Sequence, residues 1–230
     1  TTTTNFTLTV LSVNDKPSFT LTPATVTTLE DTAFTLPNFA TNILAGPTNE
    51  SSQTVTFTVT TGNTNLYQVK PAISTAGTLT FTPKLNQTGT DTVTVKALDN
   101  GGTARGGTNG SPTQTFTVVV TATNDPPVIK GLTNKSFNED TTTNLVFTVS
   151  DVDGAVASIT IAASSSDTAL IPNANIVPGV SGTNRVLAVT PATNANGTPA
   201  VITVVATDSS GVTTTTNFTL TVLSVNDKPS

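Results

Sequence analysis

Alternation of threonine with apolar residues recurs along this chain and limits its possible folds more than any other sequence feature. Clear examples are residues 6–10 (FTLTV), 55–59 (VTFTV), 116–118 (FTV) and 159–161 (ITI). A period of two places one set of side chains on a core face and the other in water, as in half-buried β-strands. Threonine suits the wet face because its branched Cβ favours extended backbone. No stretch has helical periodicity, so we expect an all-β chain.

Turn-forming residues separate the alternating runs. Gly46–Pro47, Gly62–Asn63 and Gly106–Gly107 stand between successive candidate strands. Short strands at this spacing are typical of an antiparallel sandwich or barrel. The turns therefore favour a compact antiparallel β-fold.

The chain also contains repeats at two scales. Residues 1–18 recur without a change as residues 213–230. An Asn-Asp pair followed by Pro occurs at 14–15, 124–125 and 226–227, with a spacing close to the ~100 residues of one immunoglobulin-sized sandwich. Proline ends a strand and fixes extended backbone, as a short linker requires. We expect four segments: a final strand of a preceding repeat, or a donor strand, over 1–13; sandwiches over 16–123 and 126–224; and a linker to the next repeat over 225–230.

Composition excludes several classes of function. Asp and Glu number 14 against 9 Lys and Arg, which argues against nucleic acid and anionic membranes as partners. The absence of Cys and His removes disulfides, thiolate nucleophiles, zinc sites and the usual general base. No apolar run approaches the roughly 18 residues of a membrane span, so we expect no membrane insertion by this segment. We expect a protein that is not an enzyme.

The acidic residues gather in recurring motifs. All but Glu50, Asp91 and Asp167 lie in such motifs. The motif Asp151–Val152–Asp153–Gly154 places two carboxylates on one side of a loop. Like charges held together cost free energy unless something neutralises them, and calcium takes six to eight oxygen ligands from carboxylates and carbonyls. The pattern therefore points to calcium, although Asn-Asp-Pro alone also fits ordinary turn chemistry.

The order of these motifs resembles that of cadherin-like tandem repeats in bacterial surface proteins. Each half carries a Glu-Asp pair (Glu30–Asp31, Glu139–Asp140), an Asn-containing turn with glycine, and a closing Asn-Asp-Pro linker. The resemblance covers nearly the whole chain. It implies tandem immunoglobulin/cadherin-like antiparallel β-sandwiches in a linear array, with calcium at each joint.

The resemblance also implies the calcium ligands, position by position. The inner joint would use six residues: Glu30, Asn124, Asp125, Asp151, Asp153 and Asp208. Two incomplete joints would use three residues each, namely Asn14, Asp15 and Asp99 at the N-terminal joint and Glu139, Asn226 and Asp227 at the C-terminal joint. The first sandwich has no Asp-x-Asp motif. The pair Asn49–Glu50 occurs beyond the position at which that motif is expected. The N-terminal joint is therefore expected to bind weakly, to bind through backbone carbonyls, or to be a hinge without an ion.

These observations lead to a structural function and two alternatives. We expect a stalk or fibre segment of a giant extracellular or cell-surface bacterial protein, whose neighbours are copies of the same repeat. One alternative is an adhesin module that binds a glycan or a host protein through the loops of a sandwich. The other is a fibre subunit that inserts residues 1–13 into the sandwich of a neighbour by strand addition.

Overall fold

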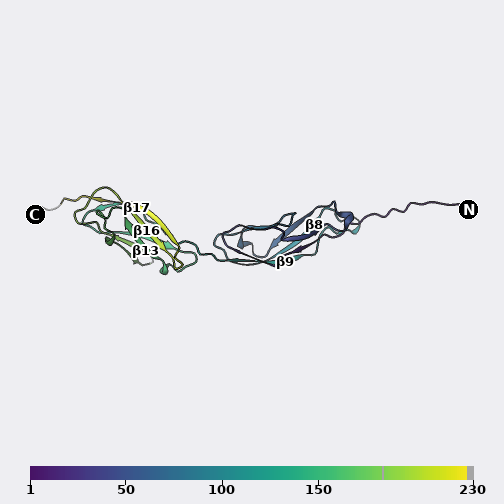
Figure 1. Ribbon diagram of the computed structural model, residues 1–230, viewed down its shortest axis with the longest axis horizontal. Helices are drawn as coiled ribbons and strands as arrows, with labels where there is room; N and C mark the ends of the chain where they lie inside the picture. The colour runs from purple at the N-terminus through teal and green to yellow at the C-terminus, as the bar shows by residue number, and fades with distance from the viewer. Residues whose placement is uncertain (183, 227–230) are drawn as a thin grey trace. The chain divides into compact units, whose positions relative to one another are not determined.

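The computed structural model describes residues 1–182 and 184–226, which form two compact units (Figure 1). The first unit comprises Thr1–Thr123 and the second begins at Asn124. Within the described residues, regular structure consists of β-strands and short 3-10 turns, and no helix is long and apolar enough to cross a membrane. The expected fold class is confirmed: each unit is an immunoglobulin/cadherin-like β-sandwich of mainly antiparallel strands.

The first unit consists of nine strands in one large sheet and two smaller ones. The large sheet has the order β2-β9-β8-β5, and it is accompanied by sheets β3-β7-β6 and β1-β4. The bounds are β1 Ser18–Leu21, β2 Thr25–Leu29, β3 Phe34–Leu36, β4 Ala40–Leu44, β5 Val55–Thr61, β6 Tyr67–Ile73, β7 Leu79–Pro83, β8 Gly89–Asp99 and β9 Gln114–Thr121.

Among the described residues of the second unit, eight strands form two four-stranded sheets. Their orders are β11-β17-β16-β13 and β10-β12-β15-β14. The bounds are β10 Val128–Lys130, β11 Lys135–Asn138, β12 Thr143–Ser150, β13 Thr160–Ser165, β14 Ile176–Ser181, β15 Asn184–Val189, β16 Ala200–Thr207 and β17 Thr213–Leu223.

Each unit contains one parallel pair that joins an early strand to the last strand. In the first unit, β2 runs parallel to β9, with Thr25 opposite Thr117 and Leu29 opposite Thr121. In the second, β11 runs parallel to β17, with Lys135 opposite Leu220. The remaining pairs are antiparallel. The last strand of each unit therefore lies inside its sheet, between an early strand and the strand that precedes it.

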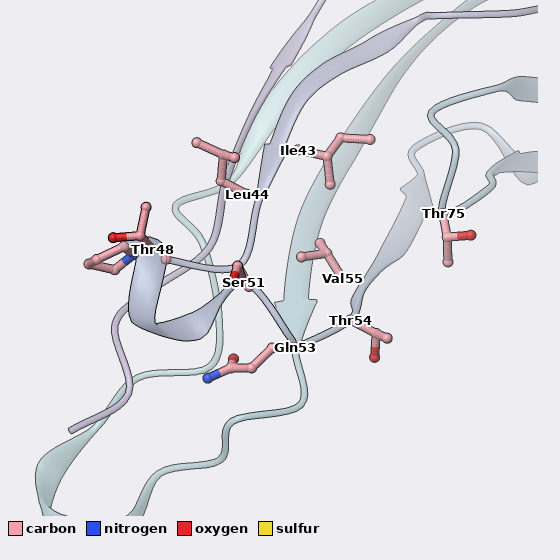
Figure 2. A pocket seen from close by; sticks show the side chains of 11 residues that line it. Ile43, Leu44, Thr48, Ser51, Gln53, Thr54, Val55 and Thr75 are labelled. Atoms are coloured by element: carbon pink, nitrogen blue, oxygen red, sulfur yellow. The ribbon is translucent and has the colours of Figure 1, made fainter. Parts of the chain in front are cut away.

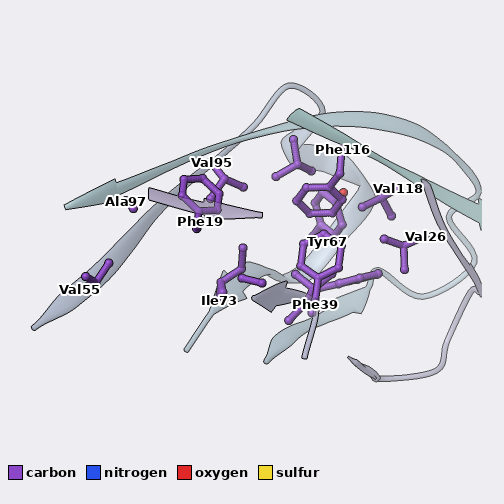
Figure 3. Close-up of a cluster of buried hydrophobic side chains, with 14 of the residues drawn as sticks. Phe19, Val26, Phe39, Val55, Tyr67, Ile73, Val95, Ala97, Phe116 and Val118 are labelled. Atoms are coloured by element: carbon purple, nitrogen blue, oxygen red, sulfur yellow. The ribbon is translucent and has the colours of Figure 1, made fainter. Parts of the chain in front are cut away.

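The alternation in the sequence produces the core. On β8, the side chains of Val93, Val95 and Ala97 are fully buried. Of the two residues between them, Thr94 is partly exposed and Lys96 is exposed. Figure 3 shows such aliphatic and aromatic side chains gathered between the sheets of the first unit. The rings of Phe39 and Phe116 meet edge to face with centroids 4.7 Å apart. Burial of one face of each strand is the main favourable term for each sandwich.

A buried tyrosine–carboxylate contact joins strands β6 and β8 of the first unit. The Tyr67 hydroxyl donates to Asp91 Oδ2 at 3.0 Å, and Asp91 Oδ1 accepts the backbone N–H groups of Gly62 (2.9 Å) and Asn63 (2.7 Å). Burial, the hydrogen bond to Asp91 and the charge of Asp91 together raise the pKa of Tyr67 far above its usual range. Asp91 therefore acts in the fold, by satisfying the turn after β5 and holding one end of β6.

Replacement of Tyr67 by phenylalanine is expected to destabilise the first unit by about 1–3 kcal/mol, because Asp91 loses a buried donor. The variant should also respond differently to alkali. Folded Tyr67 keeps its proton while the unfolded side chain ionises, so this contribution is present below pH ~10 and is lost as the pH rises further. Denaturant unfolding followed by circular dichroism at neutral and alkaline pH measures both effects. Equal stability of the two proteins at neutral pH would contradict the role of the contact.

The alternating segment at residues 6–10 forms no strand in the described structure. The assignment of residues 1–13 as the final strand of a preceding repeat, or as a donor strand, stays a prediction. Residues 1–17 belong to no strand, and Phe6 and Val10 are each 87% exposed. Alternation determines which side chains of a strand can face a core, but a strand also needs a neighbouring strand with which to share backbone hydrogen bonds. No described strand lies beside this segment.

Candidate metal centres

The Asn124–Asp125 linker docks on the N-terminal end of the second unit through two carboxylates. Asn124 Nδ2 donates to Asp208 Oδ2 at 2.7 Å, and the backbone N–H of Asp125 donates to Asp153 Oδ2 at 2.7 Å. Asp208 directly follows β16, and Asp153 lies in the loop after β12. The fold thus brings acidic side chains from separate loops to the linker.

The Asp-x-Asp-Gly loop is shaped around Asp151. Its Oδ1 atom accepts the backbone N–H groups of Asp153 and Gly154, both at 2.9 Å. Its Oδ2 atom is buried and has no hydrogen-bond partner. Asp151 therefore orders the loop with one oxygen and keeps the other available to a further ligand.

Asp208 is held in its ionised form. The hydrogen bond from Asn124 is the main cause of the lowering of the Asp208 pKa. Burial acts in the opposite direction, and the backbone N–H groups of Val212, Ser210 and Gly211 lower the pKa further. A carboxylate with a depressed pKa stabilises the fold above its unfolded pKa, and this contribution is lost as the pH falls through the folded value. Asp208 is consequently charged at neutral pH.

The N-terminal end of the first unit repeats this arrangement with different residues. Asn14 Nδ2 donates to Asp99 Oδ1 at 2.9 Å, and the backbone N–H of Asp15 donates to Glu50 Oε1 at 3.0 Å. Gln53 Nε2 completes the dock by donating to Asn14 Oδ1 at 2.9 Å. Glu50 thus makes the contact to the linker that Asp153 makes in the second unit.

Glu50 and Asp99 are strongly buried carboxylates, with 3% and 6% of their surfaces exposed. Glu50 Oε2 and Asp99 Oδ2 have no hydrogen-bond partner. Two glycines make room for the dock: a Cβ at Gly46 would overlap Glu50 Oε2, and one at Gly101 would overlap Asn14 Oδ1. The structure therefore leaves ionisable oxygens in a confined polar setting.

Glu50 is the functional candidate that sequence reasoning missed. It lies outside the recurring motifs, because the first unit lacks the string Asp-x-Asp. Its position supplied a usable signal, since it ends the short 3-10 turn Thr48–Glu50 between β4 and β5, whereas Asp151 and Asp153 lie between β12 and β13. Counting connections between strands would have identified it.

In each Glu-Asp pair, the glutamate contacts the segment after the last strand of its unit and the aspartate contacts a loop. Glu30 and Glu139 each follow the early strand of a parallel pair, and their Oε1 atoms accept the backbone N–H groups of Thr123 (3.1 Å) and Val225 (2.7 Å). These glutamates thus hold the segment that follows the last strand of their own unit.

The aspartates of the same pairs act within loops. Asp31 Oδ1 accepts the backbone N–H of Asn86 at 2.8 Å, and Asp140 Oδ1 accepts that of Asn194 at 3.0 Å. All four residues have a positive φ, between 53° and 60°. Aspartate and asparagine tolerate this left-handed region better than other non-glycine residues. These aspartates are structural supports of the turns.

The predicted ligands separate into those that the structure groups and those whose grouping stays a prediction. The second unit brings together Asn124, Asp125, Asp151, Asp153 and Asp208; the first brings together Asn14, Asp15 and Asp99, with Glu50 added. The assignment of Glu30, which belongs to the first unit, to the inner joint stays a prediction. So does the C-terminal group, in which Glu139 and Asn226 are described and Asp227 lies outside the described residues.

A surface cleft of about 700 Å³ opens beside the short turn that carries Glu50. Figure 2 shows its walls, to which Ile43 of β4 and Val55 of β5 contribute. Its lining contains no aromatic and no charged side chain: Ile43, Leu44, Ala45, Gly46, Pro47, Thr48, Ser51, Gln53, Thr54, Val55 and Thr75. A lining of this kind offers no stacking platform for a sugar, so the cleft does not favour a glycan-binding function.

No protein-family model and no curated protein matches the chain. Among solved structures, it is similar to titin domains Z1Z2 in complex with telethonin, with 18% identity, 94% of this chain and 100% of that chain covered, and a TM-score of 0.36. It is also similar to extracellular cadherin domains 3–6 of protocadherin gamma B2, with 17% identity, 92% of this chain and 48% of that chain covered, and a TM-score of 0.47. A third similar structure is domains 1–6 of the surface layer protein SbsC, with 16% identity, 74% of this chain and 20% of that chain covered, and a TM-score of 0.37. The chain spans about half of the protocadherin structure.

Proposed function

We propose that this chain is an extracellular structural repeat segment in which calcium binds at the N-terminal end of each sandwich and orders the Asn-Asp linker. One observation carries the proposal. The same dock is built twice, from Asp208 and Asp153 in one unit and from Asp99 and Glu50 in the other. Recurrence of the contacts with changed residues indicates that the arrangement of carboxylates matters more than a particular motif.

The donor chemistry of both docks suits a hard cation. Each dock offers carboxylate oxygens from positions that are far apart in sequence, together with the amide and backbone oxygens of the linker. Calcium takes six to eight such oxygens in flexible geometry, whereas magnesium requires a smaller octahedral site. In the second unit the ligands are proposed to be Asn124, Asp125, Asp151, Asp153 and Asp208; in the first they are Asn14, Asp15, Glu50 and Asp99.

A dock without metal is the alternative, in which hydrogen bonds alone hold the linker. It accounts for Glu50 Oε1 and Asp99 Oδ1, which accept donors from the linker. It does not account for the second oxygens, Glu50 Oε2 and Asp99 Oδ2, which are buried without a donor. An ionised group left in this way costs free energy unless it is paired. A bound cation removes that cost, which favours the proposal.

Calcium supports a stalk by stabilising each sandwich and fixing the start of each linker. If a site binds with a Kd of about 10 μM and the medium contains about 1 mM calcium, linkage adds about 2.7 kcal/mol per site. The absence of Cys suits a bacterial exterior in which ions take the place of disulfides. The proposed partners are neighbouring copies of the same repeat, and the chain is proposed to have no enzymatic activity.

Titration of the chelator-treated chain with calcium is expected to release measurable heat and to raise the melting temperature. The double variant Asp151→Asn, Asp153→Asn should lose the share of this stabilisation that comes from the second unit. Isothermal titration and calorimetric melting measure the two effects, with magnesium as the control ion. Identical melting profiles in excess chelator and in calcium would disprove the assignment of calcium to these sites.

A further inference from the structure

The chain contains two copies of one strand sequence in opposite environments. Residues 1–11 have the same sequence as β17, Thr213–Leu223. In β17, the side chains of Phe218, Leu220 and Val222 are 4%, 0% and 2% exposed. The same three residue types in the N-terminal copy, Phe6, Leu8 and Val10, are 87%, 79% and 87% exposed. One sequence is therefore a core strand in one place and an unpaired segment in the other.

The place that β17 occupies is a groove between two strands. β17 pairs with β11 in parallel, from Lys135 opposite Leu220 to Asn138 opposite Leu223. On its other side it pairs with β16 antiparallel, from Ala200 opposite Leu220 to Thr207 opposite Thr213. Both edges thus supply backbone hydrogen bonds, and the core supplies contacts for alternate side chains. In strand addition, backbone hydrogen bonds provide affinity and the contacts of alternate side chains provide specificity.

We propose that residues 1–11 are an exchangeable copy of β17, which fills the groove between β11 and β16 in a second copy of this chain. Because the two sequences are identical, the inserted segment makes every backbone and side-chain contact that β17 makes. An intact β17 competes for the groove with the advantage of belonging to the same chain. Insertion therefore requires that β17 of the acceptor is displaced or weakened.

The residues that follow the exchangeable copy are compatible with insertion. Val13 has the sequence position that Val225 has after β17, and the Val225 N–H donates to Glu139 Oε1 at 2.7 Å. The Val13 N–H of an inserted segment would make the same contact. The donor chain remains attached to its own first unit from Asn14 onward, through Asp99 and Glu50. An inserted segment thus joins two chains through the linker sequence that already follows β17.

The test weakens β17 in the full chain and leaves the N-terminal copy intact. Leu220→Asp places a charge at a fully buried position of β17, so the mutated strand should leave the groove. The copy with Leu8 from another molecule should then replace it. We expect the Leu220→Asp protein to form assemblies with masses that are multiples of 23.4 kDa, to grow larger as the concentration rises, and to retain a folded second unit.

Two matched variants decide the outcome. Leu8→Asp alone, at a position that is 79% exposed, should stay monomeric with unchanged melting. The double variant Leu8→Asp, Leu220→Asp should have an unfolded second unit and form no ordered assembly. Sedimentation and circular dichroism measure all three proteins. The proposal is overturned if Leu220→Asp behaves as the double variant does, whether both remain monomeric or both aggregate.

Register provides a second readout that aggregation does not reproduce. Thr221 lies opposite Ser136 in the parallel pair, and Thr9 is its counterpart in the N-terminal copy. In the Leu220→Asp background, Thr9→Cys with Ser136→Cys should give cross-linked chains on oxidation, whereas Thr7→Cys with Ser136→Cys should give far fewer. The chain has no natural cysteine, so every disulfide joins two introduced cysteines, and peptide mapping identifies the pair. Equal cross-linking of the two pairs would contradict the proposed insertion.

Discussion

Replacement of Phe147 by alanine is expected to destabilise the second unit by about 3–5 kcal/mol, a large fraction of the total stability of a domain of this size. Phe147 lies on β12, whose residues alternate between buried and exposed along its whole length, and it is 2% exposed. Removal of the ring deletes buried apolar surface and leaves a cavity that the neighbouring strands fill only incompletely. Calorimetric melting of the full chain measures the loss.

Val146 provides the matched control for this core substitution. It is the preceding residue on the same strand, it is 53% exposed, and its replacement by alanine is expected to change stability by no more than about 0.5 kcal/mol. The pair tests whether the two faces of one strand differ as the alternation requires. Similar losses for the two variants would contradict the placement of the core.

Replacement of Glu50 by glutamine is expected to have opposite effects in chelator and in calcium. Glutamine can still accept the Asp15 N–H through its carbonyl oxygen, while its neutral amide replaces the buried oxygen that has no partner. In chelator, the variant should therefore match or exceed the stability of the parent chain. In calcium, it should lose the gain of the first unit, about 2.7 kcal/mol at a hundredfold excess of calcium over Kd.

The intrinsic fluorescence of Tyr67 makes this measurement specific to the first unit, because the chain has one Tyr and no Trp. Asp31→Asn is the control, since it removes the same charge from the same unit at a side chain that accepts the Asn86 N–H. It should shift stability equally in chelator and in calcium. A Glu50→Gln variant that is destabilised to the same extent in both conditions would show that Glu50 only docks the linker.

Local patterns in the sequence predicted the strands well, because the alternation within each strand specifies its buried face and its exposed face. The segment around Phe6 and Val10 departs from this rule for a physical reason: alternation describes one strand, while pairing depends on a second. The Tyr67–Asp91 contact could not be predicted, because it joins residues of separate strands. Its only trace in the sequence is an acidic residue outside the recurring motifs.

Residues of the candidate sites were predicted where they belong to a recurring motif, and Glu50 was missed because it shares with Asp153 only its place between two strands. Asp151 and Asp153 stand two residues apart and were identified from sequence. Glu50 makes the corresponding contact from a turn with no such string. A carboxylate can reach one linker from different backbone positions when its side chain is one methylene longer, so the spacing of letters is a weaker guide than the connection between strands.

The parallel pairing of early and last strands determines how each sandwich responds to tension. When the chain is pulled from both sides, force first acts on β1, which pairs with β4. Once β1 has separated, force enters β2 at its amino end and leaves β9 at its carboxyl end. In a parallel pair these ends are at opposite limits of the pair, so the strands must slide past each other and their hydrogen bonds bear the load together. An antiparallel hairpin loaded at its open end would instead lose its hydrogen bonds in succession. The pairs β2–β9 and β11–β17 are thus shear clamps, oriented to resist extension along the chain.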